Sequence, residues 1–410
     1  MKHWLIKASL FINYFVFAIL LNSVGTVILQ VQNSYAVTES AASTLEAFKD
    51  LSIAITSFLV ASFVARIGYK HSMLVALGFI GLASLLMPAI PTFWMIKLMF
   101  VTVGVGFALV KVSVFATLGL VTENSREHVS LMSFLESFFM VGVLSGYFIF
   151  SAFIDDQNPA SRDWLQVYYV LAAMAFAAAI LLLFARLDES RVAVVKGQSK
   201  IGEFVDMMAL AVKPLVLVFV ICAFLYVLTE QAIMSWLPSF NSTILNLPAS
   251  LSVQMASILA ASTAVGRFAA GILLRRIDWF KGLATGLLLA ATLVLVTLPL
   301  AGETTGQVIT GWSSAPIAAF AFPMIGLCIA PVYPAINSVI LSALPARQHA
   351  PMSGLIVVFS ALGGTTGSII TGNLFEVFGG KVAFYFSLVP IAALLFMLYV
   401  FKRKTIGRSI

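Results

Sequence analysis

Charged residues are the scarcest class of side chain in this sequence. They make up 10% of the 410 residues, whereas hydrophobic residues make up 61%, and soluble domains usually carry roughly 25% charged residues. The polar stretches between the apolar ones are too short to fold into a soluble domain of their own. This composition excludes a soluble enzyme or binding protein and favours a chain buried largely in lipid.

Cysteines and recognisable catalytic motifs are scarce as well. The two cysteines, Cys222 and Cys328, lie inside apolar segments, so we expect free thiols and neither a disulfide framework nor a metal site. The sequence has no phosphate-binding glycine loop, no His and Glu metal motif, and no nucleophile with a nearby base. We therefore expect no enzyme activity and no cofactor. The net charge of +7 is spread over short loops, which argues against nucleic acid as a partner.

Long apolar stretches are what the sequence has in abundance. A helix of about 20 apolar residues, rising 1.5 Å per residue, crosses the roughly 30 Å hydrocarbon core of a bilayer. Twelve stretches meet this requirement, so we predict an all-α polytopic membrane protein with 12 transmembrane helices. The predicted spans are 9–32, 47–66, 72–90, 97–121, 129–153, 166–185, 214–237, 250–273, 282–300, 314–342, 351–374 and 381–401.

The predicted spans form two sets of six. We predict two six-helix bundles, residues 1–187 and 214–410, joined by a polar cytoplasmic linker, 188–213. An internal repeat supports this division, because four residues of the fifth span recur in the eleventh at a constant offset of 220 (352 minus 132). They are Met132, Ser133, Leu135 and Phe139, which recur as Met352, Ser353, Leu355 and Phe359. Two such repeats with a binding site between them are typical of duplicated transporters.

The basic and aromatic residues predict the orientation of the chain in the membrane. Most of the 24 Lys and Arg residues fall on one side of the predicted spans, and the positive-inside rule then places both termini in the cytoplasm. All six Trp residues fall at predicted span ends. We therefore expect them to form an interfacial aromatic belt.

Two charges lie deep within neighbouring predicted spans. Lys111 of the fourth span and Glu136 of the fifth lie at similar depth, and charges at such depth usually face a bundle interior or a watery cavity. They form either a structural ion pair that locks the N-terminal bundle or part of the central cavity. We favour the second alternative, in which Lys111 holds substrate and Glu136 both contacts substrate and carries a coupled proton.

Further polar residues are candidates for the same cavity. Glu230 and Gln231 lie in the seventh span, and Asn22, Tyr333 and Asn337 add hydrogen-bonding groups in the first and tenth. Three residues open the second span, Glu46, Lys49 and Asp50, either as a solvated helix start or as an outer gate and proton-access vestibule. Glu230 and Asp50 are the reserve candidates for the proton carrier. Arg267, in the eighth span, is interpreted as a cytoplasmic-side anchor or gate.

Two motifs predict local backbone geometry. Pro331 and Pro334 should bend the tenth span, since proline removes a backbone hydrogen bond. The glycines of the eleventh span, Gly363, Gly364 and Gly367, should allow close helix packing.

Four segments together resemble the fucose/galactose/glucose permease branch of the major facilitator superfamily. They are GLCIAPVYPAI from Gly326, SGLIVVFSALGG from Ser353, EQAIMSWLPSF from Glu230 and GRFAAG from Gly266. The superfamily's gating signature between spans two and three is kept as Arg66, Gly68 and Lys70, with Ala65 where an Asp is usual. Compared with the fucose permeases, the charge is inverted at Lys111 and introduced at Glu136, and their first-span Asp has no counterpart near Asn22.

The resemblance implies the major facilitator fold and a monomer in the bacterial inner membrane, in contact with lipid. It also implies a secondary active transporter that moves a small polar solute, such as a sugar, a sugar acid or another small organic anion, by alternating access. Proton-coupled symport is the favoured mode. The alternative is a proton-driven antiporter that exports a small metabolite, drug or siderophore, and a non-transporting sensor on the same fold is a further alternative.

Overall fold

The computed structural model describes residues 4–122, 125–187, 189, 207–274, 276–301, 309–345 and 348–406. All regular secondary structure in these ranges is helical, as predicted, and eleven helices among them are long and apolar enough to cross a membrane. The chain divides into two compact units. Unit 1 comprises Met1–Tyr35 and Phe48–Gly197, and unit 2 comprises Ala36–Ala47 and Gln198–Ile410. Most of the predicted linker, 188–213, lies outside the described residues.

The helices of unit 1 follow the first six predicted spans. They are α1 (Trp4–Asn22), α2 (Val24–Tyr35), most of α3 (Glu39–Ile67), α4 (Tyr69–Ala89), α5 (Phe93–Val121), α6 (Ser125–Ser151), the short η1 (Asp163–Gln166) and α7 (Val167–Phe184). The first predicted span is divided into α1 and α2 at Ser23. There Asn22 donates to the Ala18 carbonyl at 2.9 Å and Ser23 to the Leu20 carbonyl at 2.8 Å, so side chains bond to carbonyls of the last turn of α1.

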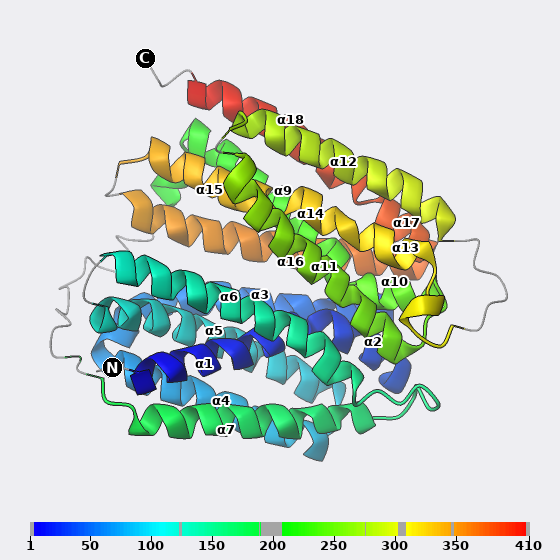
Figure 1. The fold of residues 1–410 in the computed structure, drawn as a ribbon, viewed down its shortest axis with the longest axis horizontal. Helices are drawn as coiled ribbons and strands as arrows, with labels where there is room; N and C mark the ends of the chain where they lie inside the picture. The colour runs from blue at the N-terminus through cyan, green and yellow to red at the C-terminus, as the bar shows by residue number, and fades with distance from the viewer. Residues whose placement is uncertain are drawn as a thin grey trace. The chain divides into compact units, whose positions relative to one another are not determined.

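Unit 2 is more segmented. Its helices are α9 (Pro214–Met234), α10 (Leu237–Thr243), α11 (Ala249–Leu273), α12 (Trp279–Leu300), η2 (Trp312–Ser314), α13 (Ile317–Ala321), η3 (Phe322–Met324), α14 (Ile325–Ile329), α15 (Val332–Ala343), α16 (His349–Phe378), α17 (Gly380–Tyr385) and α18 (Leu388–Ile406). The tenth predicted span is the run from α13 to α15, drawn in yellow to orange in Figure 1. It is interrupted next to Pro323 and Pro331 because neither residue can donate a backbone hydrogen bond.

The internal repeat is visible in the packing of each unit. In unit 1, α1 packs on α6, and α4 packs on α5 and α7; in unit 2, α9 packs on α16, and α12 packs on α14 and α18. The paired helices approach closely at glycines. A Cβ atom on Gly363 or Gly367 of α16 would collide with the carbonyl oxygen of Phe224 or Leu228 on α9, and one on Gly142 of α6 would lie 2.9 Å from the Phe15 carbonyl oxygen. The predicted close packing at Gly363 and Gly367 is confirmed.

The tryptophans correct part of the sequence analysis. Trp4 and Trp94 are exposed, as an interfacial belt requires, but Trp164 and Trp236 are buried. The Trp164 indole N–H donates to the Ser34 hydroxyl at 3.1 Å, and that of Trp236 donates to the Ser368 carbonyl at 3.1 Å. The belt prediction is wrong for these two residues because their N–H groups find partners inside the protein and their rings fill its core.

Candidate functional site

A polar cluster of unit 2 joins α9 to α11. Nη2 of Arg267 donates to Oε1 of Glu230 at 3.1 Å, and the hydroxyl of Tyr226 donates to the same oxygen at 2.7 Å. The Glu230 side chain is 18% exposed and that of Arg267 is 42% exposed. From the sequence, Glu230 was expected in the cavity and Arg267 was expected to be a cytoplasmic-side anchor or gate. The structure places them in direct contact.

Tyr333 and Asn337, both on α15, belong to the same cluster. The Tyr333 ring stacks on that of Tyr226, with ring centroids 5.5 Å apart and planes inclined by 23°. Its hydroxyl lies 3.0 Å from that of Ser360 on α16 and within hydrogen-bonding reach of Asn337. The Asn337 Oδ1 atom is buried and has no hydrogen-bond partner among the described residues. We call Tyr226, Glu230, Arg267, Tyr333, Asn337 and Ser360 the Arg267 cluster.

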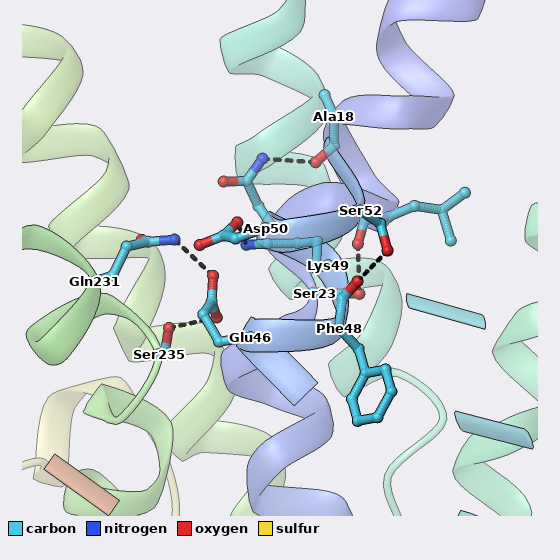
Figure 2. A network of polar contacts seen from close by, with 11 residues as sticks. Ala18, Ser23, Glu46, Phe48, Lys49, Asp50, Ser52, Gln231 and Ser235 are labelled. Carbon is cyan, nitrogen blue, oxygen red and sulfur yellow. Dashed lines mark hydrogen bonds and ion pairs between the residues drawn. The ribbon is translucent and has the colours of Figure 1, made fainter. Parts of the chain in front are cut away.

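Gln231 lies next to Glu230 in sequence but takes part in a different set of contacts. Figure 2 shows the Glu46 carboxylate held from two sides: Gln231 donates to Oε1 at 2.7 Å, and the Ser235 hydroxyl donates to Oε2 at 2.9 Å. Glu46 belongs to the segment Ala36–Ala47, which is part of unit 2. The amide of Gln231 is thus engaged by a buried carboxylate, a contact that the sequence did not indicate.

The start of the second predicted span is not solvated. Helix α3 begins at Glu39, eight residues earlier than predicted (47 minus 39). Glu46, Lys49 and Asp50 are only 0%, 4% and 8% exposed. Nζ of Lys49 lies 3.4 Å from Oδ1 of Asp50, and both side chains are drawn in Figure 2. The solvated helix start is therefore wrong, because the helix extends beyond these residues and buries them. The vestibule remains a prediction.

Lys111 of α5 and Glu136 of α6 form the charged site of unit 1. The charge of Glu136 acts on both the Lys111 ammonium and the Tyr14 hydroxyl. Both charged residues are exposed on unit 1. Aromatic rings border them: the Lys111 ammonium lies 5.7 Å from the centre of the Phe107 ring. Tyr14 packs against Phe107 and Phe139 with centroid distances of 6.4 and 5.2 Å. The site thus combines two opposite charges with the neighbouring aromatic rings of Tyr14, Phe107 and Phe139.

The gating signature is tied to the end of α7. Gly68, between α3 and α4, has a φ of +94°, which strongly favours glycine. The Lys70 ammonium donates to the carbonyls of Leu183 and Ala185 at 2.9 and 2.8 Å, and its backbone N–H donates to Oε1 of Glu189 at 2.8 Å. A carboxylate at the N-terminus of α4 is favoured by the helix dipole. The side chain of Arg66 lies outside the described residues.

Glu189 was missed by the sequence analysis, which noted only that Ala65 stands where an acid is usual. The available signal was the pair of acids Asp188 and Glu189 in the sequence just after the sixth span, opposite a basic loop. Within the described ranges, no group of three or more His, Cys, Asp or Glu side chains is arranged to hold a metal ion.

The chain forms two compact units of membrane-spanning helices, and each unit has charged residues inside its spans. These features are typical of a polytopic helical membrane protein of the transporter type. The sequence profile of the Major Facilitator Superfamily matches residues 10–325. The chain therefore belongs to this superfamily. It is a multi-pass membrane transporter of small solutes and not an enzyme.

Similar folds occur among solved structures. A bacterial homologue of the human lysosomal transporter Spinster aligns at 13% identity with a TM-score of 0.78, covering 97% of this chain and 96% of that one. The nucleoside transporter NupG aligns at 13% identity with a TM-score of 0.76, covering 97% and 99%. The fucose:proton symporter FucP of E. coli aligns at 16% identity with a TM-score of 0.61, covering 98% and 99%. No curated protein sequence matches the chain.

Proposed function

We propose that the protein is a proton-coupled symporter that carries a small polar solute, such as a sugar, a sugar acid or another small organic anion, across the bacterial inner membrane. The observation that carries this proposal is an acid beside a base within the membrane-spanning helices of each unit, Glu136 near Lys111 and Glu230 bonded to Arg267. Charges at such positions usually mark substrate or proton pathways. A carboxyl group next to a base can change its protonation state when a substrate alters that pairing.

The proposed roles follow the chemistry of each side chain. Glu136 is the principal proton carrier, with Glu230 and Asp50 as further candidates. The proposed substrate-binding residues are Lys111 and Glu136 in unit 1 and Glu230, Tyr333 and Asn337 in unit 2. Asn22 and Gln231 are secondary candidates, because their amide nitrogens already donate to Ala18 and Glu46.

The remaining parts of the proposal concern organisation. We propose that the protein works as a monomer with both termini in the cytoplasm, and that residues 1–187 and 214–410 act as the two moving halves. The loop with Arg66, Gly68 and Lys70 would then control gating on the cytoplasmic side. The hydrogen bonds of the Lys70 ammonium to the carbonyls of Leu183 and Ala185 support a mechanical link between this loop and the end of α7, and Glu189 binds the loop through the Lys70 backbone N–H.

The test is a proton-flux measurement on purified protein in liposomes that contain a pH-sensitive dye. External addition of L-fucose, D-xylose, uridine, D-gluconate or D-galacturonate should acidify the lumen if one of them is carried inward with protons. Alkalinisation would instead identify an antiporter. Accumulation of a solute without any pH change would contradict proton coupling.

A further inference from the structure

Arg267 has more hydrogen-bonding capacity than its neighbours use. A guanidinium carries five N–H donors in a planar fork. Among the described residues, those of Arg267 reach one oxygen of Glu230 and the hydroxyl of Tyr226. Val265 and Phe268 present apolar, exposed side chains on the same helix, whereas Arg267 reaches toward α9. An arginine held at a single carboxylate oxygen, and 42% exposed, can bind a second carboxylate through two parallel hydrogen bonds.

Glu230 is arranged to release Arg267. Both donors, Tyr226 and Arg267, are directed to Oε1, and Oε2 has no hydrogen-bond partner among the described residues. A proton placed on Oε2 therefore breaks no existing hydrogen bond, while it removes the negative charge with which Arg267 is paired. The groups that face Glu230 are Tyr226 on its own helix, Arg267 on α11 and Tyr333 on α15. The residue of α16 in this cluster is the neutral Ser360, and the described structure places no charged side chain of α14 or α18 against Glu230.

The rest of the cluster matches a hydroxylated ligand. The ring of Tyr333, which is half-buried and stacked on the buried ring of Tyr226, offers a flat apolar surface beside the guanidinium, as sugar rings and short carbon chains require. The buried Oδ1 of Asn337 is an acceptor with no partner among the described residues, and a ligand hydroxyl would satisfy it. A cation, a flat surface and an acceptor together select a polyhydroxylated acid over a neutral sugar or an amine.

We propose that the Arg267 cluster binds the carboxylate of a hydroxylated organic acid, with Arg267 as the direct ligand. Glu230 takes up a proton at Oε2 when its ion pair with Arg267 is replaced by the ion pair of Arg267 with the substrate. The charge of the cluster is the same before and after. The ion pair of Arg267 and ionised Glu230 is neutral, and so is Arg267 bound to the substrate anion beside a protonated Glu230. The anion and one proton thus enter together.

This inference deepens the proposed function by naming the substrate class. If Glu136 carries its own proton in the same cycle, two protons accompany each anion. One net positive charge then moves inward, so uptake responds to the membrane potential. Arg267 is thereby assigned to substrate binding and not to a gate.

The experiment measures binding directly, in detergent, without transport. D-galacturonate and D-gluconate are compared with the neutral D-galactose by titration calorimetry at about pH 5.5 and about pH 7.5, where both acids are ionised. The wild-type protein should bind at least one acid about tenfold or more tightly than D-galactose, and more tightly at the lower pH. Arg267→Gln should weaken acid binding about tenfold or more. Glu230→Gln should keep acid binding and lose its pH dependence.

Two further variants control for damage to the fold. Arg267→Lys keeps the charge but loses the planar fork, so it should bind the acid with intermediate affinity. Lys402→Gln removes a basic residue of unit 2 that pairs with Asp278 at 3.2 Å away from the cluster, and should leave binding unchanged. Gel filtration of each variant tests whether it is folded, and a folded variant should elute like the wild type.

The inference is overturned if neither acid binds, if D-galactose binds as tightly as the acids, or if Arg267→Gln binds the acids like the wild type. These outcomes are distinct from failure of symport. Binding that depends on Arg267 without proton influx in liposomes would contradict symport alone. Proton influx driven by neutral L-fucose or D-xylose, and unaffected by Arg267→Gln, would contradict this inference alone.

Discussion

The charged sites of the two units are built from similar parts and held in different ways. In unit 2, Arg267 and Tyr226 converge on a single oxygen of Glu230, beside a pair of stacked tyrosines. In unit 1, Glu136 acts on Lys111 and Tyr14, the Phe107 ring lies beside Lys111, and Phe139 packs on Tyr14. Arginine presents a rigid planar fork, whereas lysine is a compact point charge on a flexible stem. The comparison suggests that the unit 2 site orients a planar anion and that the unit 1 site responds to charge.

The largest expected effect tests the unit 1 site. Glu136→Gln keeps the size and shape of the side chain but cannot bind and release a proton. Uphill, pH-driven uptake into liposomes should fall about tenfold or more, while exchange of substrate across the membrane, which needs no net proton movement, should persist. Radiolabelled uptake and counterflow measure the two activities separately.

The matched control for that variant is Glu127→Gln. Glu127 lies at the start of the same helix and pairs with Lys7 at 2.7 Å, so the same chemical change is made away from Lys111 and Glu136. It should leave both activities intact. If Glu136→Gln accumulates substrate as well as the wild type, the pair with Lys111 is structural and the two sites differ more than we propose.

A second, smaller effect concerns the cation of the same site. Lys111→Ala should weaken substrate binding by about 1 to 3 kcal/mol, or roughly 5- to 150-fold in Kd, because a charge-assisted hydrogen bond is lost. Titration calorimetry with the solute found by proton flux gives this number. An unchanged Kd together with a lower thermal midpoint would instead indicate a structural role for Lys111.

These two sites also show what the sequence can and cannot predict. Helix number, the all-α class and the break at Pro331 follow from hydropathy and from backbone chemistry, which depend on local sequence. The break at Pro323 was not predicted, and Pro334, where a bend was expected, lies within the first turn of α15. The interaction of Lys111 with Glu136 could be foreseen, since both lie at the same depth of consecutive spans. The contact of Glu230 with Arg267 could not, because it depends on how α9 and α11 are rotated about their axes.

The start of α3 was mispredicted for a related reason. Glu46, Lys49 and Asp50 look like a solvated helix end, since buried charges are rare. In the structure, the partners of these residues are a mixture of local and distant groups: Asp50 is a sequence neighbour of Lys49, but Gln231 and Ser235 lie on or just after α9. Local sequence carries no sign of such distant partners. Glu189, which bonds to the α4 backbone, escaped notice in the same way.

Tyr333→Phe tests how far the unit 2 cluster depends on its hydrogen bonds. The variant keeps the ring stacked on Tyr226 but loses the contact of the hydroxyl with Ser360 at 3.0 Å. A single neutral hydrogen bond contributes about 1 kcal/mol, so binding of a sugar acid should weaken by less than about tenfold. Ser360→Ala is the matched variant on α16 and should have a similar effect. A loss as large as that of Arg267→Gln would mean that the hydroxyl, and not only the ring, contacts the ligand.

The smallest expected effect comes from the ion pair of Asp278 and Lys402, which provides a baseline for the charged sites of the two units. Asp278 caps α12 by accepting from the Lys281 backbone N–H at 3.1 Å and also contacts the Lys402 ammonium at 3.2 Å. These contacts, the backbone hydrogen bond first, hold the pKa of Asp278 below its usual value. Because the pKa is lower in the folded state, the stabilisation is present above the usual carboxyl pKa and is lost as the pH falls through the lowered value.

Two substitutions separate the cap from the ion pair. Asp278→Asn keeps an acceptor for the cap and should lower the stability at neutral pH by at most about 1 kcal/mol, the usual limit for an exposed ion pair. Asp278→Ala removes the cap as well and should cost more, since a lost N-cap contributes about 1 kcal/mol. Thermal midpoints measured from neutral to acidic pH should show the difference between Asp278→Asn and the wild type shrinking as the pH falls. A difference that grows on acidification would show that Asp278 stabilises the fold in its protonated form.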